Sequence, residues 1–336
     1  MRVAVVILNW NGKLFLEKFL QNVLESSPQG TIYVADNASS DGSMQFIRAN
    51  YPGVVVIDNK ENWGFAGGYN VALNELKEEF YVLLNSDVEV SPNWLVPLIE
   101  LLDSDSKIAA CQPKVLAYNQ QSHFEYAGAC GGFIDKFGYP FCRGRMFDSL
   151  EEDNGQYDSA QEVFWATGAS MFVRSSVYKD LGGLDADFFA HMEEIDFCWR
   201  AKRAGYKIMV EPKSTVYHVG GGTLSRSNPW KTFLNFRNGL ELLAKNLPKR
   251  ILLQTLFLRM VLDGVAAFKF LLSGQPKDFW AVLKAHAAFY GRLKTTLNKR
   301  TGDFSPVSEQ YSKSIVWEYF AKGRKRFTDL PSDNFR

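Results

Sequence analysis

The sequence predicts an α/β fold with a mostly parallel central sheet flanked by helices, followed by a C-terminal helical extension. Short β-branched apolar runs alternate with segments of helical length through the first third of the chain. These runs contain few polar residues, as expected for parallel strands that are covered on both faces. From about residue 229, long apolar segments with interleaved Lys and Arg replace the alternation. We therefore expect one domain over residues 1–228 and a helical region over residues 229–336.

The elements of the first part follow in order along the chain. The expected strands cover residues 3–8, 31–35, 54–57, 80–84 and 108–111. The expected helices between and after them cover residues 14–24, 43–49, 66–76 and 94–102. A Gly-, Asp-, Tyr- and Phe-rich stretch then indicates an excursion of short strands or a loop over residues 118–161. Regular structure resumes with an apolar run at 163–173, a helix at 193–204 that Gly205 ends, and a strand at 206–210.

The C-terminal region predicts two long helices, over residues 250–272 and 279–297. Arg259, Asp263 and Lys269 interrupt the first, which is typical of an amphipathic helix rather than of a membrane span. Two interpretations of this region stay open. The helices pack as a pair on the main domain, or they contact a membrane surface or a second copy in a homodimer.

Composition argues against several classes of protein. Of 336 residues, 46% are hydrophobic and 22% charged, which argues against a disordered chain. The net charge of +1 argues against a strongly basic nucleic-acid-binding protein. The four cysteines form no CxxC pair and no disulfide framework, so we expect a reducing, cytoplasmic location.

Polar segments follow four successive expected strands, at residues 9–12, 36–42, 59–68 and 85–87. Ligands of open α/β sheets bind beyond the carboxyl ends of the strands, so one shared polar site is expected there. Ordinary turn chemistry is the alternative for each segment taken alone. The Gly-rich residues 62–70 lack the features of a P-loop or a dinucleotide fingerprint, although a turn into a helix can still bind an anion.

Two groups of side chains are candidates for chemistry. Asp87, beside Asn85 and Ser86, could hold a divalent cation that neutralises a diphosphate, unless the segment is only an Asx turn. His218, followed by glycines 220–222, could be a second ligand and would favour Mn²⁺ over Mg²⁺. Glu193 and Glu194 begin an expected helix. They either complement its dipole or supply a general base that deprotonates a hydroxyl.

In this order, the motifs resemble the family-2 glycosyltransferases of the GT-A fold, and in particular their bacterial rhamnosyltransferase-like branch. The resemblance covers the expected domain over residues 1–228. It rests on the segments VVILNWNG, VADNASSDGS, NWGFAGGYNVAL, LLNSDVEV, TGASMFVRSSVYKDLGGLDADFF, HMEEIDFCWRAKRAGYKI and YHVGGGT.

The resemblance implies an inverting transfer of a sugar from a nucleotide-diphosphate-sugar to an acceptor hydroxyl, in cell-surface polysaccharide or glycolipid synthesis. It implies a UDP- or dTDP-sugar donor, a saccharide or lipid-linked acceptor, a divalent metal (Mn²⁺ or Mg²⁺), and no nucleic-acid partner. A lipid-linked acceptor would place the protein at the inner face of the membrane.

The resemblance also implies roles for single residues. Glu194 matches the usual base, with Glu193 the lesser candidate, and Glu in place of the family's Asp lengthens the reach by one methylene. Asp87 and His218 match metal ligands, and Asn85 replaces an acid, which leaves the metal one charged ligand fewer. Trp165, Thr167 and Gly168 match an acceptor loop. The residues that match donor-binding positions are Leu8, Trp10, Asp36, Asn62, Gly64, Phe65, Asn85 and Ser86.

Two other functions compete with this interpretation. A sugar nucleotidyltransferase also combines an α/β nucleotide site with a metal-binding acid, but it usually carries a basic Gly-rich loop that residues 9–13 match poorly. A catalytically silent nucleotide-sugar-binding protein would have lost its acids. Asp87, Glu193 and Glu194 are all acidic here, so such a loss is not indicated.

Overall fold

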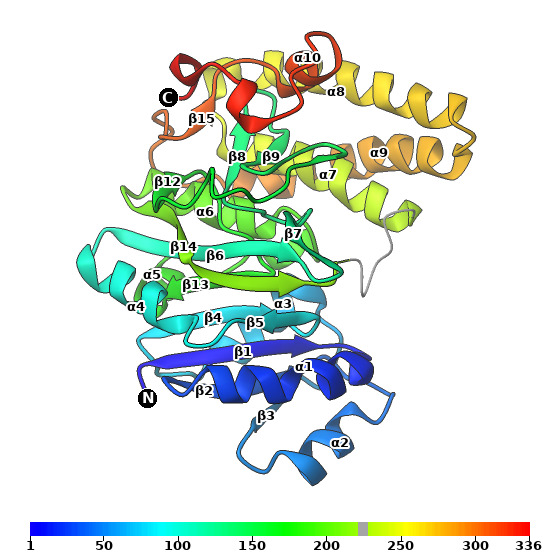
Figure 1. The fold of residues 1–336 in the computed structure, drawn as a ribbon. Helices are drawn as coiled ribbons and strands as arrows, with labels where there is room; N and C mark the ends of the chain where they lie inside the picture. Colours follow the sequence, from blue (N-terminus) through cyan, green and yellow to red (C-terminus); the bar gives the residue numbers. More distant parts are fainter. Residues whose placement is uncertain (221–227) are drawn as a thin grey trace.

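The computed structural model describes residues 1–220 and 228–336, which fold on two β-sheets (Figure 1). The larger sheet has ten strands, and eight of them follow the order β12-β14-β6-β13-β4-β1-β2-β3. The remaining two branch from this path, since β5 pairs with β14 and β7 pairs with β6. The expected glycines 221 and 222 lie outside the described residues.

Four parallel strands form one half of the large sheet: β1 (Val3–Asn9), β2 (Gly30–Asp36), β3 (Val55–Asp58) and β4 (Phe80–Asn85). β1 lies between β2 and β4, and β3 pairs with β2. The connections contain α1 (Lys13–Ser26), α2 (Ser43–Asn50) and α3 (Gly64–Leu73). This half confirms the predicted strand–helix alternation.

The other half of the large sheet is mixed. β13 (Ser170–Arg174) lies between β4 and β6 (Ile108–Ala117) and runs antiparallel to both. β14 (Lys207–His218) is parallel to β6 and antiparallel to β5 (Val88–Val90) and β12 (Gln161–Val163). The sequence run 163–173 therefore ends one strand, passes through a loop and begins another. The other elements here are α4 (Leu95–Ser104), β7 (Gln120–Phe124), α5 (Ser175–Asp180), the 3₁₀ helix η1 (Ala186–Phe188) and α6 (Glu193–Arg203).

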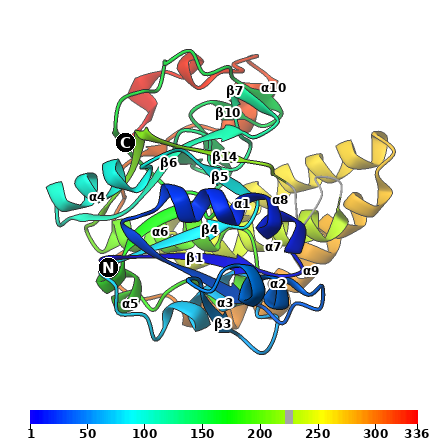
Figure 2. The ribbon, with the colours of Figure 1, turned by 60° about the horizontal axis from the view of Figure 1, so that its bottom comes forward.

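Helices cover both faces of the large sheet (Figure 2). Because successive side chains of a strand point to opposite faces, β1 contributes to two separate apolar clusters. Val3, Val5 and Ile7 pack in a cluster with residues of α1 and α4. Ala4 and Val6 belong to the cluster that contains residues of α3 and α6. The sheet is thus buried on both sides, as its apolar strands predict.

The excursion expected at residues 118–161 supplies most of the smaller sheet, whose order is β11-β10-β9-β8-β15. Its strands are β8 (Gly132–Asp135), β9 (Pro140–Cys142), β10 (Arg145–Met146), β11 (Ser149–Leu150) and β15 (Gln310–Tyr311). β15 comes from the far end of the chain and pairs in parallel with β8.

The C-terminal region is helical: α7 (Pro229–Asn246), α8 (Lys249–Leu272), α9 (Pro276–Asn298) and α10 (Ile315–Phe320), with the short 3₁₀ helices η2 (Phe327–Asp329) and η3 (Ser332–Asn334). Leu240, Leu242 and Leu243 of α7 join the apolar cluster that also holds α3 and α6. In Figures 1 and 2, α8 and α9 lie side by side and extend beyond the sheet. The boundary at residues 228/229 stays a prediction. Within the described part of the chain, α8 alone is long and apolar enough to cross a membrane, by length and composition.

Candidate active site

A hydrogen-bonded network joins the ends of β1 and β2 to the start of α2. Asn9 is fully buried, and its amide nitrogen lies within hydrogen-bond distance of Asp36 Oδ1 (3.2 Å) and of the hydroxyls of Ser39 and Ser43 (3.0 Å each). The second oxygen of Asp36 accepts a hydrogen bond from the Ser39 amide at 3.0 Å. Both oxygens of Asp36 are thus engaged, so any contact with a nucleobase would have to share one of them.

The residues expected to line the donor form the turn into α3. Asn62 Oδ1 accepts a hydrogen bond from the Gly64 amide at 2.9 Å, and Asn37 Nδ2 donates to the Gly64 carbonyl at 2.8 Å. Gly64 has a φ of +69°, and a Cβ there would lie 2.5 Å from the ring of Phe189. The Phe65 amide donates to the Phe189 carbonyl at 2.7 Å. Glycine at position 64 therefore lets this turn lie directly against the segment that precedes α6.

His218, at the end of β14, lies between two carboxylates. Its Nε2 is 3.1 Å from Asp87 Oδ1, and its Nδ1 is 3.2 Å from Glu125 Oε2. All three side chains are buried. The amide nitrogen of Asn85 lies 3.4 Å from the same Nε2. The pairing of β14 with β5 brings this end of β14 to the residue that follows Asp87. The structure thus brings Asp87 and His218 together, as the sequence analysis expected.

The two carboxylates and the imidazole stabilise one another's charged forms. Burial disfavours the imidazolium, but the hydrogen bonds to Asp87 and Glu125 outweigh this and raise the pKa of His218 to about 10. Burial also opposes ionisation of Asp87 and Glu125, yet His218 holds the pKa of both below the ordinary value. Sequence reasoning missed Glu125 because it lies in the irregular stretch 118–161, where no local pattern singles it out.

A divalent metal fits this place through two protein ligands. Asp87 and His218 lie 3.1 Å apart and offer a carboxylate and, once Nε2 is deprotonated, a neutral imidazole, which is a donor pair suited to Mn²⁺ or Mg²⁺. In the described parts of the chain, residues 1–220 and 228–336, no three His, Cys, Asp or Glu side chains gather as a group that could hold a metal ion. A metal bound here would therefore need further oxygen ligands from a bound diphosphate.

Glu193 and Glu194 occupy the first turn of α6. Glu193 is buried and Glu194 half-buried, and each has a carboxylate oxygen without a hydrogen-bond partner among the described residues. Burial raises the pKa of Glu194 to about 7. Burial, followed by repulsion from Glu194, raises the pKa of Glu193 well above its usual range. Buried carboxylates that leave one oxygen unpaired and resist ionisation are poor structural groups, which favours a chemical role for the pair.

The segment before α6 is strained and is fixed by α7. Phe189, His191 and Met192 have φ between 67° and 75°, in the left-handed region that such residues rarely adopt. Asn238 of α7 is fully buried, and its amide nitrogen lies 2.7–3.0 Å from the carbonyl oxygens of Phe188, Ala190 and His191. This side chain therefore holds the backbone that presents Glu193 and Glu194.

The expected acceptor residues lie in the loop between β12 and β13 and are largely packed. Trp165 is buried, and its indole nitrogen donates to the Phe133 carbonyl at 2.9 Å. Thr167 is also buried, and its hydroxyl accepts a hydrogen bond from the Ala169 amide at 3.2 Å. A Cβ at Gly168 would lie 2.9 Å from the ring of Phe65. The loop thus contacts the donor segment, and its role toward an acceptor stays a prediction.

Backbone contacts connect the Asp87 end of the site to the Glu194 end. The Asn85 amide donates to the Ala169 carbonyl at 3.0 Å, in the same loop whose Gly168 contacts Phe65. Phe65 in turn bonds to Phe189, which precedes α6. Of the other expected donor residues, Trp10 is exposed, Leu8 and Ser86 are half-buried, and no contact assigns them a ligand.

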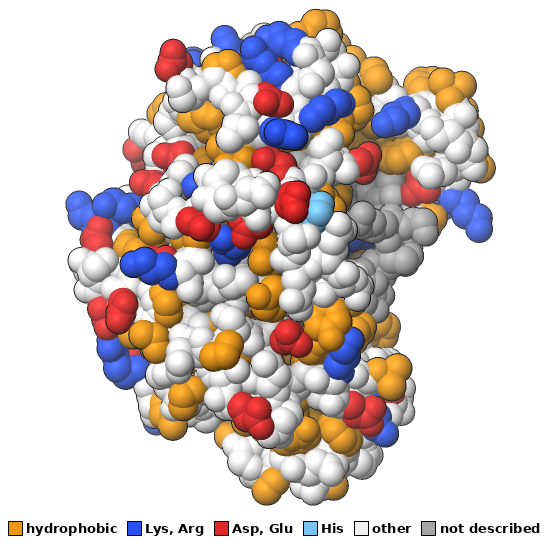
Figure 3. Space-filling model, viewed as in Figure 1, with side chains coloured by type: hydrophobic (Ala, Val, Ile, Leu, Met, Phe, Trp, Pro, Cys, Tyr) orange, Lys and Arg blue, Asp and Glu red, His pale blue; other side chains and the backbone are white. Residues whose placement is uncertain are grey.

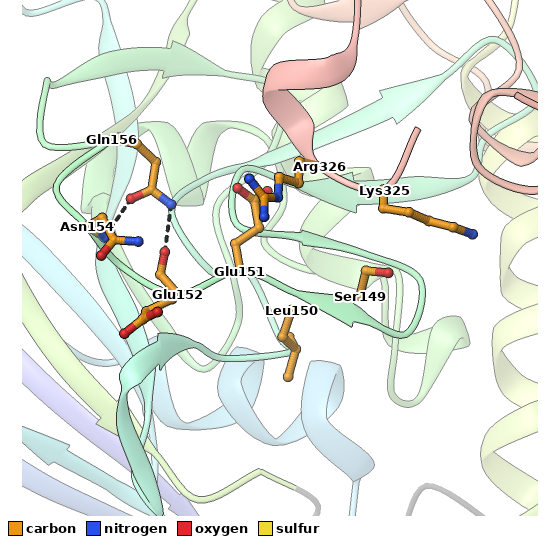
Figure 4. A pocket seen from close by; sticks show the side chains of 8 residues that line it. All are labelled: Ser149, Leu150, Glu151, Glu152, Asn154, Gln156, Lys325 and Arg326. Carbon is orange, nitrogen blue, oxygen red and sulfur yellow. Dashed lines mark hydrogen bonds between the residues drawn. The ribbon is translucent and has the colours of Figure 1, made fainter. Parts of the chain in front are cut away.

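The cavity drawn in Figure 4 belongs to a different part of the molecule. It measures about 310 Å³ and lies between residues 149–156 and the C-terminal residues Lys325 and Arg326. Gln156 is held there by hydrogen bonds with the backbone of Asn154 and Glu152, both 2.7 Å long. None of the candidate site residues lines this cavity, so it does not bear on the chemistry.

The fold and the site together define a class of protein. A partly parallel sheet ends in a carboxylate–imidazole pair suited to a metal. A continuous set of contacts leads from it to the segment before Glu193 and Glu194, which each have one carboxylate oxygen unpaired among the described residues. This is the arrangement of an enzyme that transfers a group from an anionic donor to a nucleophile.

Comparison with known proteins finds a matching family and several relatives. Residues 4–153 match the family described as Glycosyl transferase family 2. The chain is 25% identical to a low-salt glycan biosynthesis hexosyltransferase of Haloferax volcanii, over 73% of this chain and 75% of that protein. It is 24% identical to an N-acetylglucosaminyl-diphospho-decaprenol L-rhamnosyltransferase of Mycobacterium tuberculosis, over 64% of this chain and 75% of that one.

A solved structure supports the same fold. The chain resembles GalNAc-T7 with UDP, GalNAc and Mn²⁺, with a TM-score of 0.58 and 16% identity. The alignment covers 74% of this chain and 48% of the other, so this chain spans about half the length of that protein. This likeness shows the GT-A fold. The family match and the relatives show that the protein is a glycosyltransferase, which transfers a sugar from a nucleotide-sugar to an acceptor.

Proposed function

We propose that this glycosyltransferase uses Glu194 as its general base, and takes its sugar from a UDP- or dTDP-sugar with inversion at the anomeric carbon. The observation that carries the proposal is the state of Glu194. It is a half-buried carboxylate with a partnerless oxygen and a pKa near 7, at the start of a helix that α7 holds in place. A base whose pKa lies near the working pH is ionised often enough to act and basic enough to accept a proton.

The donor and acceptor are inferred from the relatives. GalNAc-T7 binds UDP and Mn²⁺, and the mycobacterial relative acts on a sugar linked to a decaprenol diphosphate. For this chain we propose a nucleotide-diphosphate-sugar donor and a saccharide or lipid-linked saccharide acceptor. The expected setting is cytoplasmic, in the synthesis of a surface polysaccharide or glycolipid.

Asp87 and His218 would hold the divalent metal beside the diphosphate of the donor. When bound, a divalent cation supplies positive charge that stabilises the departing nucleotide diphosphate. Glu125, 3.2 Å from Nδ1, would orient the His218 ring and leave Nε2 for the metal.

The proposed reaction is a single displacement. The carboxylate of Glu194 accepts the proton of the acceptor hydroxyl, and the acceptor oxygen forms a bond to the anomeric carbon. The bond from that carbon to the diphosphate oxygen breaks, and the nucleotide diphosphate leaves with the electron pair. One base and no enzymic nucleophile give inversion, as in inverting glycoside hydrolysis.

The test compares Glu194→Gln with Glu193→Gln. We first identify a donor by incubating the protein with Mn²⁺ and a panel of nucleotide-sugars, scoring slow hydrolysis of the donor. Glu194→Gln should then lower kcat for transfer by at least about a thousandfold while the Kd for the nucleotide changes little, because the base acts mainly in the transition state. Glu193→Gln should retain much more activity.

Other outcomes would correct the proposal in definite ways. Normal turnover in Glu194→Gln together with loss in Glu193→Gln would assign the base to Glu193. Release of inorganic diphosphate from a sugar phosphate and a nucleoside triphosphate would indicate a sugar nucleotidyltransferase instead. Tight nucleotide-sugar binding without turnover of any donor or acceptor would indicate a catalytically silent binding protein.

A further inference from the structure

Two charged side chains in the middle of α8 face the protein rather than the solvent. Arg259 and Asp263 are buried and bond to each other at 2.8 Å. Asp263 also accepts a hydrogen bond from the hydroxyl of Tyr139 at 2.8 Å and lies 3.3 Å from His286 of α9. Arg259 donates to the Phe137 carbonyl at 3.0 Å. These bonds join one face of α8 to the β8–β9 hairpin and to α9.

The opposite face of α8 is apolar and exposed. Six large apolar side chains lie three or four positions apart along it, which places them on one side of the helix. They are between 50% and 87% exposed. We call this set the outer stripe; its members are Leu253, Phe257, Val261, Val265, Phe268 and Leu272. A surface helix of a soluble protein normally turns its apolar side chains to the protein and its polar side chains to the solvent. The outer stripe is therefore a candidate binding surface for an apolar partner.

Neighbouring elements extend the exposed apolar surface. Trp280 and Tyr290 of α9 are 58% and 60% exposed, and Trp317 and Phe320 of α10 are 63% and 52% exposed. Lys269 Nζ lies 4.8 Å from the centre of the Phe320 ring, which places α10 beside α8. Figure 3 shows hydrophobic side chains, interspersed with Lys and Arg, along the upper right edge where Figure 1 draws α8. Exposed aromatic rings beside lysines are typical of the membrane–water interface.

The charge of the α8–α9 hairpin is strongly asymmetric. Residues 249–300 contain ten Lys and Arg and only two acids, a net charge of +8. Since the whole chain carries +1, the remainder carries −7. Both acids of the hairpin, Asp263 and Asp278, are buried, so its exposed charged groups are basic. A basic rim around an apolar stripe matches the chemistry of an anionic lipid surface.

We propose that the outer stripe, with Trp280, Trp317 and Phe320, docks on the surface of an anionic lipid bilayer. The helix lies in the interface and does not cross the bilayer, because a crossing would pull the Arg259–Asp263 pair away from Tyr139 and into lipid. A second copy is a poorer partner, because pairing would bring together two surfaces whose exposed charged groups are basic. This proposal does not depend on the identity of the catalytic base.

Vesicle sedimentation tests the docking with the full chain. The wild-type protein should sediment with vesicles of phosphatidylglycerol and phosphatidylcholine, weakly with phosphatidylcholine alone, and less at high salt. The triple variant Leu253→Gln, Phe257→Gln and Phe268→Gln should bind the anionic vesicles at least about tenfold more weakly, because it loses three inserted apolar groups. Lys269→Gln with Lys277→Gln should weaken binding to the anionic vesicles and reduce its dependence on salt.

The matched control carries the same kind of change on other surfaces. Leu14 and Val71 are 77% and 45% exposed and lie outside the hairpin, so Leu14→Gln with Val71→Gln should bind vesicles as the wild type does. Circular dichroism checks that all variants are folded. Wild-type protein that stays in solution with anionic vesicles would overturn the proposal. A lipid-free dimer that the triple variant dissociates would instead assign the stripe to a second copy.

Discussion

Two carboxylates of α6, two positions apart, titrate in opposite directions because their neighbours differ. Burial raises the pKa of Glu194 to about 7, and backbone hydrogen bonds oppose this shift only in part. Burial acts on Asp196 too, but Arg200 and Lys245 lie within 2.8 Å of its Oδ2 and hold its pKa below the usual value. Asp196 is thus a structural anion that joins α6 to α7, while Glu194 can exchange a proton near neutral pH.

This difference predicts how stability depends on pH at position 194. The pKa of Glu194 is about 7 in the folded protein and near 4.5 when unfolded, so the folded state holds the extra proton between these values. The stability of the wild-type protein should therefore fall as the pH rises from 5 to 8. Glu194→Gln lacks this titrating group, so the corresponding loss of stability should be absent. Between pH 5 and pH 8, the difference in unfolding free energy between Glu194→Gln and the wild type should shift by about 2–3 kcal/mol in favour of the variant. Urea unfolding at both pH values measures this.

The control for that measurement is Glu61→Gln, which removes an exposed carboxylate and should change the pH dependence little. Transfer needs the ionised form of Glu194, so the rate should rise over the same pH range in which the folded state loses stability. Identical pH dependence in the wild type and Glu194→Gln would contradict the raised pKa.

Single residues were predictable from sequence to different extents. Asp87 and His218 end strands, so the rule that ligand sites lie beyond strand ends locates them, and the structure brings them together. Glu125 lies in the excursion between β7 and β8. Only the tertiary path of that excursion brings it to His218, and no local pattern could show this.

At the scale of elements, α7 positions the site from outside the part of the chain that carries the family motifs. Asn238 contacts three carbonyl oxygens of residues 188–191, and Lys245 and Asn246 bond to Asp196. The strained backbone before α6 persists because these contacts fix it. α7 therefore acts on Glu194 through the loop and is a positioning element for it.

We predict that Asn238→Ala lowers both stability and transfer. The change removes this donor from one buried and two partly buried carbonyl groups, which should cost about 1–3 kcal/mol of unfolding free energy. In the variant that remains folded, kcat should fall more than the donor Kd rises, since the loop presents the base. Denaturant unfolding and steady-state kinetics measure the two effects.

The matched control is Asn50→Ala, which removes an exposed amide-to-carbonyl bond of 2.8 Å to Phe46. It should cost less than about 1 kcal/mol and leave kcat unchanged. If Asn238→Ala destabilised the protein without changing kcat, Asn238 would be structural and would have no part in presenting Glu194.

The fold was predictable where neighbouring elements in sequence are neighbours in space. β1 to β4 and their helices follow this rule, and their apolar runs identify them. β13 and β15 do not follow it. β13 enters between β4 and β6 after an excursion of more than fifty residues, and β15 pairs with a strand far earlier in the chain. Such pairings depend on long-range packing, which local periodicity does not encode.

At the scale of the whole molecule, the C-terminal segment completes the smaller sheet. β15 pairs with β8, and Tyr311 is fully buried against Phe141 and Phe335, with ring centres 5.9 Å and 5.0 Å apart. Phe327 and Phe335 also pack on Phe133. The end of the chain thus supplies core residues to strands that belong to the first half of the sequence, so both should unfold together.

We predict that Tyr311→Ala destabilises the whole protein by about 3–5 kcal/mol, because it leaves a large cavity in this aromatic cluster. Tyr290→Ala, at a tyrosine 60% exposed, should cost less than about 1 kcal/mol. In urea, tryptophan fluorescence and far-ultraviolet circular dichroism should report one coincident transition, shifted in Tyr311→Ala without a new phase. A separate early transition in that variant would mean that residues 229–336 unfold on their own. It would favour an independent domain that begins near residue 229 over a single cooperative unit.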